Sequence, residues 1–159
     1  MKLIKALILA SLLLLASCGE SKEKAPESSN DSAKEKLAQK FGLTLFELEN
    51  GVGPIKEKLD LSPLDIEMAS RGQKLFEEKC ASCHKLDERF TGPAQRDVIE
   101  RRTPEYIMNM ILNPEEMIAK HPEVKKMLAI YMTSMTYQNV SKEQAREILE
   151  YFRKVDKEK

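Results

Sequence analysis

One short run, Cys80-Ala81-Ser82-Cys83-His84, constrains this chain more than any other feature. C-x-x-C-H is the spacing at which two thiols attach one c-type haem and the next imidazole binds its iron. A zinc site is one alternative, but it needs a further pair of cysteines or histidines, and the chain has three cysteines and two histidines. A redox-active pair of cysteines is the other alternative. Such a pair usually follows a strand, whereas this motif follows a helical pattern. The sequence therefore predicts one haem on Cys80 and Cys83, with His84 as an iron ligand.

The third cysteine, Cys18, follows a segment with the features of an export signal. Lys2 and Lys5 precede an apolar run over residues 6–16, shorter than the about 20 residues that span a bilayer. Leu-Ala-Ser-Cys then predicts a lipoprotein signal over residues 1–17 and a lipidated Cys18; the alternative is an ordinary cleaved signal with an incidental cysteine. We expect a protein anchored by lipid to a bacterial membrane and facing the periplasm, where haem is joined to such motifs.

The charge balance excludes the usual nucleic-acid binders. The chain has 26 basic and 26 acidic residues, and loss of Lys2 and Lys5 leaves 24 against 26, a net charge of −2. Nucleic acid needs a basic face. Aromatic residues make up only 6% of the chain and there is no tryptophan, so a buried haem would supply much of the apolar surface of a small core.

Composition divides the rest of the chain into three parts. Residues 18–40 are rich in Ser, Glu and Lys and predict a flexible tether. A short helix is expected from Ser32 to Phe41. Residues 41–61 form an N-terminal extension, in which Thr44 and Glu47 match a capping box, and we expect it to pack against the domain that follows. Residues 62–159 form that domain.

The domain pattern is helical throughout. Ser62 as cap and Pro63 as first helical residue predict a helix that runs toward the cysteines. Further helix starts are predicted at Thr103-Pro104, Asn113-Pro114, Pro122 and the capping box of Ser141 with Gln144. No stretch alternates as a strand. We expect an all-α fold of about five helices around one haem.

Over about residues 64–155 the chain resembles the class I single-haem cytochromes c. The match is carried by Gly72, Phe76, Cys80, Cys83, His84, Gly92, Pro93, Met135 and Tyr151. The resemblance implies that Gly72 lies where the first and last helices cross, with an aromatic residue of the last helix beside it. It also implies that the carbonyl of Pro93 accepts the ring N–H of His84, which would fix the orientation of the imidazole.

The resemblance implies a methionine as sixth iron ligand, on a loop six residues before the cap of the last helix. Six methionines follow the motif: Met108, Met110, Met117, Met127, Met132 and Met135. Met135 has that spacing to Ser141, and Met132 is its rival. A proline usually flanks this methionine, whereas Thr136 follows here, so the loop is expected to be less rigid. His121 is the alternative that would give a bis-His iron, but its place before a proline predicts an exposed loop residue.

Three further residues are candidates for the haem propionates. Arg101 or Arg102 would offer a bidentate fork, with a solvated charge pair as the alternative, and Tyr106 would offer its hydroxyl. The Arg-Arg-Thr-Pro run and the Gly-Val-Gly-Pro leader are also similar to lipoprotein cytochromes that accompany nitrous oxide reductase.

The expected function is electron transfer without enzymatic activity, because a His/Met iron has no open position for a substrate. The expected partners are a quinol-oxidising complex as donor and a terminal oxidase or nitrogen-oxide reductase as acceptor. A haem peroxidase or small-ligand-binding protein with a labile sixth ligand is one alternative. A docking module with a merely structural haem is the other.

Overall fold

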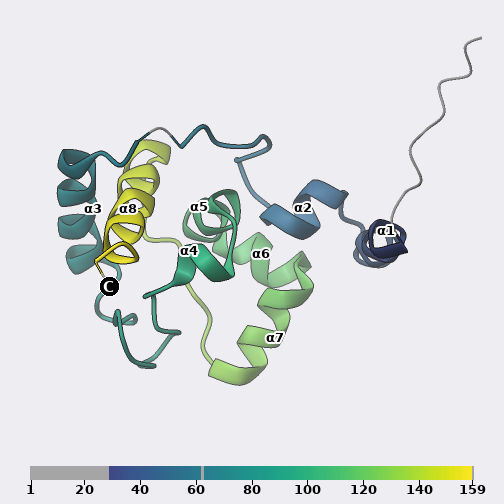
Figure 1. Cartoon of the computed structure of the whole chain (residues 1–159). Helices are drawn as coiled ribbons and strands as arrows, with labels where there is room; N and C mark the ends of the chain where they lie inside the picture. Colours follow the sequence, from purple (N-terminus) through teal and green to yellow (C-terminus); the bar gives the residue numbers. More distant parts are fainter. Residues whose placement is uncertain (1–28, 62, 159) are drawn as a thin grey trace, which may run out of the picture.

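The computed structural model describes residues 29–61 and 63–158, and all regular structure in this part of the chain is helical. The helices are α1 (Ser29–Phe41), α2 (Leu45–Asn50), α3 (Ile66–Lys79), α4 (Val98–Arg101), α5 (Pro104–Leu112), α6 (Pro114–Lys120), α7 (Pro122–Tyr131) and α8 (Lys142–Val155) (Figure 1). The predicted all-α fold is confirmed, and the short α4 is an addition to the expected helices. The predicted signal and Cys18 lie outside the described residues.

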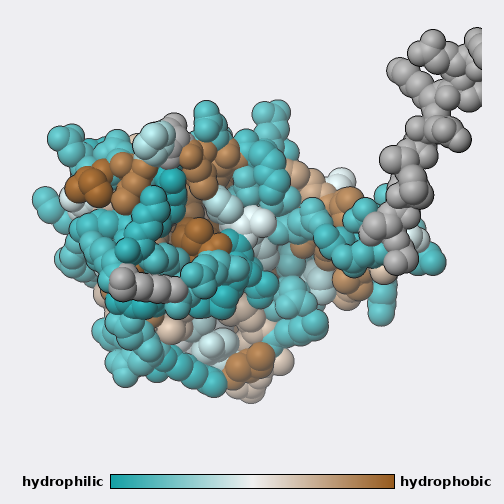
Figure 2. All heavy atoms as spheres, viewed as in Figure 1, coloured by the Kyte–Doolittle hydropathy of each residue, from teal (hydrophilic) through white to brown (hydrophobic). Residues whose placement is uncertain are grey.

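No helix among the described residues is long and apolar enough to cross a membrane. Figure 2 shows a mostly hydrophilic face on which apolar residues form separate patches. The exposed large apolar side chains include Ile66, Phe90, Ile130 and Met132. Ile66 lies on α3, Phe90 on a loop, and Ile130 and Met132 at the end of α7, so they do not form one continuous helix face.

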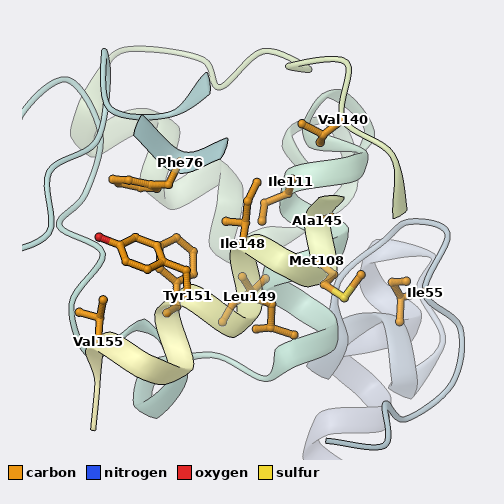
Figure 3. Packing of buried hydrophobic residues seen from close by; sticks show 12 residues of the cluster. Ile55, Phe76, Met108, Ile111, Val140, Ala145, Ile148, Leu149, Tyr151 and Val155 are labelled. Carbon is orange, nitrogen blue, oxygen red and sulfur yellow. The ribbon is translucent and has the colours of Figure 1, made fainter. Parts of the chain in front are cut away.

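Helices α3 and α8 form the most extensive helix pair and lie side by side in Figure 1. A Cβ at Gly72 of α3 would lie 1.9 Å from the carbonyl oxygen of Glu147 in α8, so only glycine permits this approach. Phe76 packs against Tyr151 (Figure 3), with ring centroids 5.6 Å apart. The ring of Phe152 lies at the same centroid distance from Phe76. The contact of the two helices at Gly72 is therefore as the resemblance implied.

The predicted start of α3 at Ser62 and Pro63 is wrong. The helix begins at Ile66, and its N-cap is Asp65, whose carboxylate accepts the backbone N–H of Met68 at 2.9 Å. The N–H of Asp65 donates in turn to the carboxylate of Glu150 at 2.9 Å. A long-range hydrogen bond to α8 therefore helps to set where α3 begins.

Glu150 is a fully buried carboxylate at the centre of this contact, with 0% exposure. Arg153 lies 2.8 Å from it, and Arg146 pairs with its other oxygen. Burial alone would raise the pKa of Glu150, but the hydrogen bonds from Arg153, Asp65 and Arg146 outweigh it and hold the pKa below its ordinary value.

The predicted caps of the later helices are confirmed. Thr44 and Ser141 each open a capping box, in which the cap hydroxyl accepts an N–H and the third helical side chain accepts the N–H of the cap. Thr103 caps α5, and Pro114 and Pro122 are the first residues of α6 and α7. The starts of α2, α5 and α8 depend on a capping side chain, and those of α6 and α7 have a proline in the first turn and no side-chain cap. Both signals are local, so the sequence is sufficient to predict them.

Helix α1 begins at Ser29 rather than at Ser32, so residues 29–40 of the predicted tether are helical. Ala38 on α1 is 3% exposed. Lys34 lies 2.6 Å from Glu49 of α2. The short helix expected from Ser32 to Phe41 is therefore present and begins three residues earlier, and tertiary contacts with α2 and the domain stabilise it.

Asn109 of α5 holds the segment after α2 against the domain. Its amide N–H donates to the carbonyls of Asn50 and Ile55 at 2.9 and 3.0 Å, and its oxygen accepts the N–H of Ile55 at 2.9 Å. A Cβ at Gly53 would lie 2.4 Å from this oxygen. The glycine-rich turn thus fits around a buried amide, and the expected packing of the extension on the domain is confirmed.

Candidate functional site

The C-x-x-C-H motif lines a cavity of about 430 Å³. This volume is in the usual range for small-molecule and cofactor sites. Its walls come from the helices α3 to α8 and the loops between them. Much of the wall is apolar and includes Ile107, Ile111, Val124, Leu128, Ile148 and Phe152. Cys80, Cys83 and His84 all line it, so the structure brings together the residues that the spacing pointed to.

The motif is a tight turn at the end of α3. The carbonyl oxygen of Cys80 accepts the N–H of Cys83 at 3.0 Å and that of His84 at 2.9 Å. The turn presents two thiols and one imidazole to the same cavity. Both cysteines are free, with Cys80 partly buried and Cys83 exposed.

The His84 ring is held by the loop Gly92-Pro93. Its Nδ1 lies 3.0 Å from the carbonyl oxygen of Pro93, the contact that the resemblance implied. A Cβ at Gly92 would lie 2.4 Å from Cε1 of His84. The N–H of Gly92 donates to the carbonyl of Cys83 at 2.8 Å. The loop therefore fixes the imidazole plane and leaves Nε2 as the nitrogen for a metal.

Gln95 is a site residue that the sequence did not reveal. Its Nε2 lies 2.8 Å from both Nδ1 of His84 and the carbonyl oxygen of Pro93. When Nδ1 carries the proton, it donates to that carbonyl, and the amide of Gln95 donates to the same oxygen. A lone glutamine in a loop carries no motif, so no sequence signal marks it.

The structure distinguishes the two main methionine candidates, Met135 and Met132, by their position relative to the cavity. Met135, on the loop between α7 and α8, lines the cavity and packs against the main core. Met132 ends α7 in a left-handed conformation, is 84% exposed and is not among the lining residues. The rival position is thus turned to solvent. Met110 on α5 and Met127 on α7 also line the cavity, from within helices.

All three propionate candidates line the cavity. The buried hydroxyl of Tyr106 has no hydrogen-bond partner among the described residues. The guanidinium of Arg102 lies 5.0 Å from the centroid of the Tyr106 ring. Arg101 donates to the backbone carbonyls of Arg96 and Ala94, at 2.6 and 2.9 Å. Tyr106 is therefore a buried donor that a ligand in the cavity would satisfy.

The prediction that His121 is an exposed loop residue is wrong. Its side chain is 1% exposed, and Nε2–H donates to the carbonyl of Leu48 at 3.0 Å. Its ring packs edge-on against Tyr106, with centroids 5.2 Å apart. Helix α2 covers the junction of α6 and α7, a long-range contact that buries this residue. His121 is not among the cavity-lining residues, so nothing in the geometry favours it as an iron ligand.

Comparison with protein families decides the assignment. The family model of cytochrome c matches residues 69–156. This chain belongs to the cytochrome c family. A comparison with curated proteins found no match.

Solved structures of cytochromes c are similar to this one. The cytochrome c of Rhodothermus marinus is 47% identical, with 71% of this chain and 97% of that chain covered and a TM-score of 0.68. An engineered form of it, Rma TDE, is 47% identical over 70% of this chain and 96% of that chain, with a TM-score of 0.66. The same engineered form bound to a carbene intermediate is 46% identical over 70% and 96%, with a TM-score of 0.64.

Cytochromes c bind haem c covalently, and this cytochrome c therefore carries haem c with its iron. The residues present fit the group, because two free thiols, one oriented imidazole and one unpartnered buried hydroxyl face a mostly apolar cavity. They fit the alternatives poorly. Burial, with a smaller effect of Cys83, raises the pKa of Cys80 to about 11, whereas a redox pair needs a lowered pKa. No cluster of three or more His, Cys, Asp or Glu exists in the described chain for zinc.

Proposed function

We propose that this cytochrome c is a membrane-anchored electron carrier whose haem is attached through Cys80 and Cys83 and ligated by His84 and Met135. The observation that carries this proposal is that His84 and Met135 come from separate loops and line one cavity. Bound haem supplies a one-electron iron couple, and a thioether ligand favours its reduced form.

The chain's own residues keep this couple stable. Pro93 accepts the ring N–H of His84, which orients the imidazole and raises its basicity. The apolar part of the wall would limit the water around the bound group, so fewer solvent dipoles would rearrange when the charge changes. Tyr106 and Arg102 line the cavity and would donate to the propionates, which would satisfy the buried hydroxyl of Tyr106.

The anchor and the partners rest on the sequence. Cys18 follows a segment typical of lipoprotein signals, and lipidation there would hold the domain at the periplasmic face of a bacterial membrane. The donor is a quinol-oxidising complex, and the acceptor is a terminal oxidase or a nitrogen-oxide reductase. Nitrous oxide reductase is the acceptor that the Arg-Arg-Thr-Pro similarity favours.

The experiment combines a spectrum with a turnover assay on purified holoprotein. We expect haem that resists acid-acetone extraction, a weak near-infrared band in the ferric state from iron–sulfur ligation, and a reversible potential. Reduced protein mixed with nitrous oxide reductase and with a terminal oxidase should be oxidised rapidly by at least one of them. Extractable haem or the absence of the band would overturn the proposed ligation.

A small-ligand-binding or peroxidase function is the second candidate, favoured by one comparison and one structural feature. An engineered relative holds a carbene intermediate, and the segment that carries Met135 has no regular secondary structure between α7 and α8. A loop of this kind would release its ligand more readily than a helix. Rapid binding of carbon monoxide by the reduced wild type at neutral pH would favour this function, and slow or absent binding would favour the carrier.

A further inference from the structure

His121 is a buried ionisable group one side chain away from the haem cavity. It is 1% exposed, and its ring lies edge-on to that of Tyr106, which lines the cavity. The chain has only two histidines, and His84 is the one in the haem motif. His121 is thus the only other imidazole able to exchange a proton.

The hydrogen bonds of His121 leave one nitrogen unused. Nε2–H donates to the carbonyl of Leu48 in α2 at 3.0 Å. This bond requires the proton to be on Nε2 in the neutral ring, so Nδ1 is an acceptor. Nδ1 is buried and has no partner among the described residues. A buried unpaired acceptor costs free energy, and a structure that retains one needs an explanation.

The charged groups around His121 have opposite effects on its pKa. Arg102 lies 5.0 Å from the Tyr106 ring centroid and 3.8 Å from Glu123 of α7. Burial lowers the pKa of His121; the Leu48 carbonyl and Glu123 raise it, Arg102 lowers it, and the net direction is down. The ring is therefore neutral at pH 7, and the contact from α2 is the uncharged carbonyl of Leu48.

We propose that His121 is a redox-linked proton site, so that this cytochrome c takes up a proton on Nδ1 when its haem is reduced. Reduction adds one electron from the donor to the haem iron. The added negative charge favours a positive charge nearby, and a buried setting strengthens this attraction. The proton comes from solvent, and reoxidation releases it as the electron leaves. No covalent bond other than N–H forms or breaks.

The test is a potentiometric titration of the holoprotein between pH 4.5 and 8. In the wild type we expect the redox equilibrium to shift toward the reduced form as the pH falls, by up to about tenfold per pH unit. His121→Gln, which keeps a donor for Leu48 but binds no proton, should remove most of this dependence. Glu123→Gln is the matched control, and it should move the dependent region to lower pH without removing it. A pH-independent wild type, or an unchanged slope in His121→Gln, overturns the proposal.

A second measurement on the wild type covers the case in which His121→Gln does not fold. The ring-proton resonances of His121, titrated by NMR in both oxidation states, should show a higher pKa in the reduced protein. Equal values overturn the proposal. The inference rests on the proposed electron-transfer function, and the two fail differently. If the proposed ligation fails, the ferric near-infrared band is absent, whereas failure of this inference alone leaves the band in place and a potential that does not follow His121.

Discussion

A side chain at Gly92 would collide with the ring of His84, because its Cβ would lie 2.4 Å from Cε1 and 2.8 Å from Nδ1 of the imidazole. The backbone of Gly92 thus packs directly on the imidazole that we propose as the iron ligand. The carbonyl oxygen of Pro93, the next residue, accepts a hydrogen bond from Nδ1–H of the same ring. Two adjacent residues therefore fix both the position and the rotation of His84.

Gly92→Ala should displace the imidazole or the loop. We expect overpacking to lower the free energy of unfolding by about 2 kcal/mol and to change the reduction potential, because the bond between His84 and Pro93 is disturbed. Gly42→Ala is the control, since Gly42 has a positive φ of 66° but no atom within 4 Å of the added methyl group. It should cost about 1 kcal/mol and leave the potential unchanged. Equal potentials in all three proteins would contradict the role of Gly92.

Gly72→Ala should separate the two main helices. The added Cβ would meet the backbone of Glu147, which cannot move without shifting α8. We expect the free energy of unfolding in urea to fall by about 3 kcal/mol. Ser70→Ala, on the exposed side of α3, should change it by less than about 0.5 kcal/mol. Similar losses in the two variants would show that the crossing is not tight.

Acid should weaken the domain through Glu150. Its pKa lies below its ordinary value of 4.5, so the unfolded chain takes up the proton first as the pH falls. The stabilisation is complete above that ordinary value and is lost as the pH drops through the lowered pKa. Glu150→Gln should cost about 3 kcal/mol at pH 7 and progressively less in strong acid, as urea titrations would show. The exposed Glu115→Gln should leave the pH profile unchanged, and parallel profiles of wild type and Glu150→Gln would contradict the argument.

The anchor is tested by fractionation of cells that express the full chain. Cys18→Ser should release the cytochrome into the soluble fraction outside the cytoplasm, or block its processing, because stable attachment takes two lipid chains or more. Wild type should remain in the membrane fraction until detergent is added. Recovery of the wild type entirely in the soluble periplasmic fraction would rule out the lipid anchor.

Local signals in the sequence predicted most of the fold. The caps at Thr44, Thr103 and Ser141 depend on neighbours within one helical turn, and each is confirmed. The start of α3 depends on Glu150, 85 residues away from Asp65. Long-range hydrogen bonds of that kind leave no local sequence pattern. The serine-proline pattern at Ser62-Pro63 therefore predicted the wrong start for α3.

The same distinction applies to the site. The spacing of Cys80, Cys83 and His84 was sufficient to predict that they share one site, and all three line the same cavity. The short α4 was missed because its first N–H groups are held by the carboxylate of Asp156 beyond α8, which accepts from Asp97 at 2.7 Å and Ile99 at 3.2 Å. The burial of His121 was missed because a segment 73 residues away covers it.

The central claim is that Met135 is the sixth ligand, and the ferric near-infrared band with a potentiometric titration tests it most directly. Met135→Ala should abolish the band and lower the reduction potential, because the thioether no longer favours the reduced iron. Met132→Ala, at a residue that is 84% exposed, should change neither. Met110→Leu and Met127→Leu test the two other methionines that line the cavity, and both should keep the band. The account would be contradicted if the Met135→Ala protein kept the near-infrared band and one of the other three variants lost it.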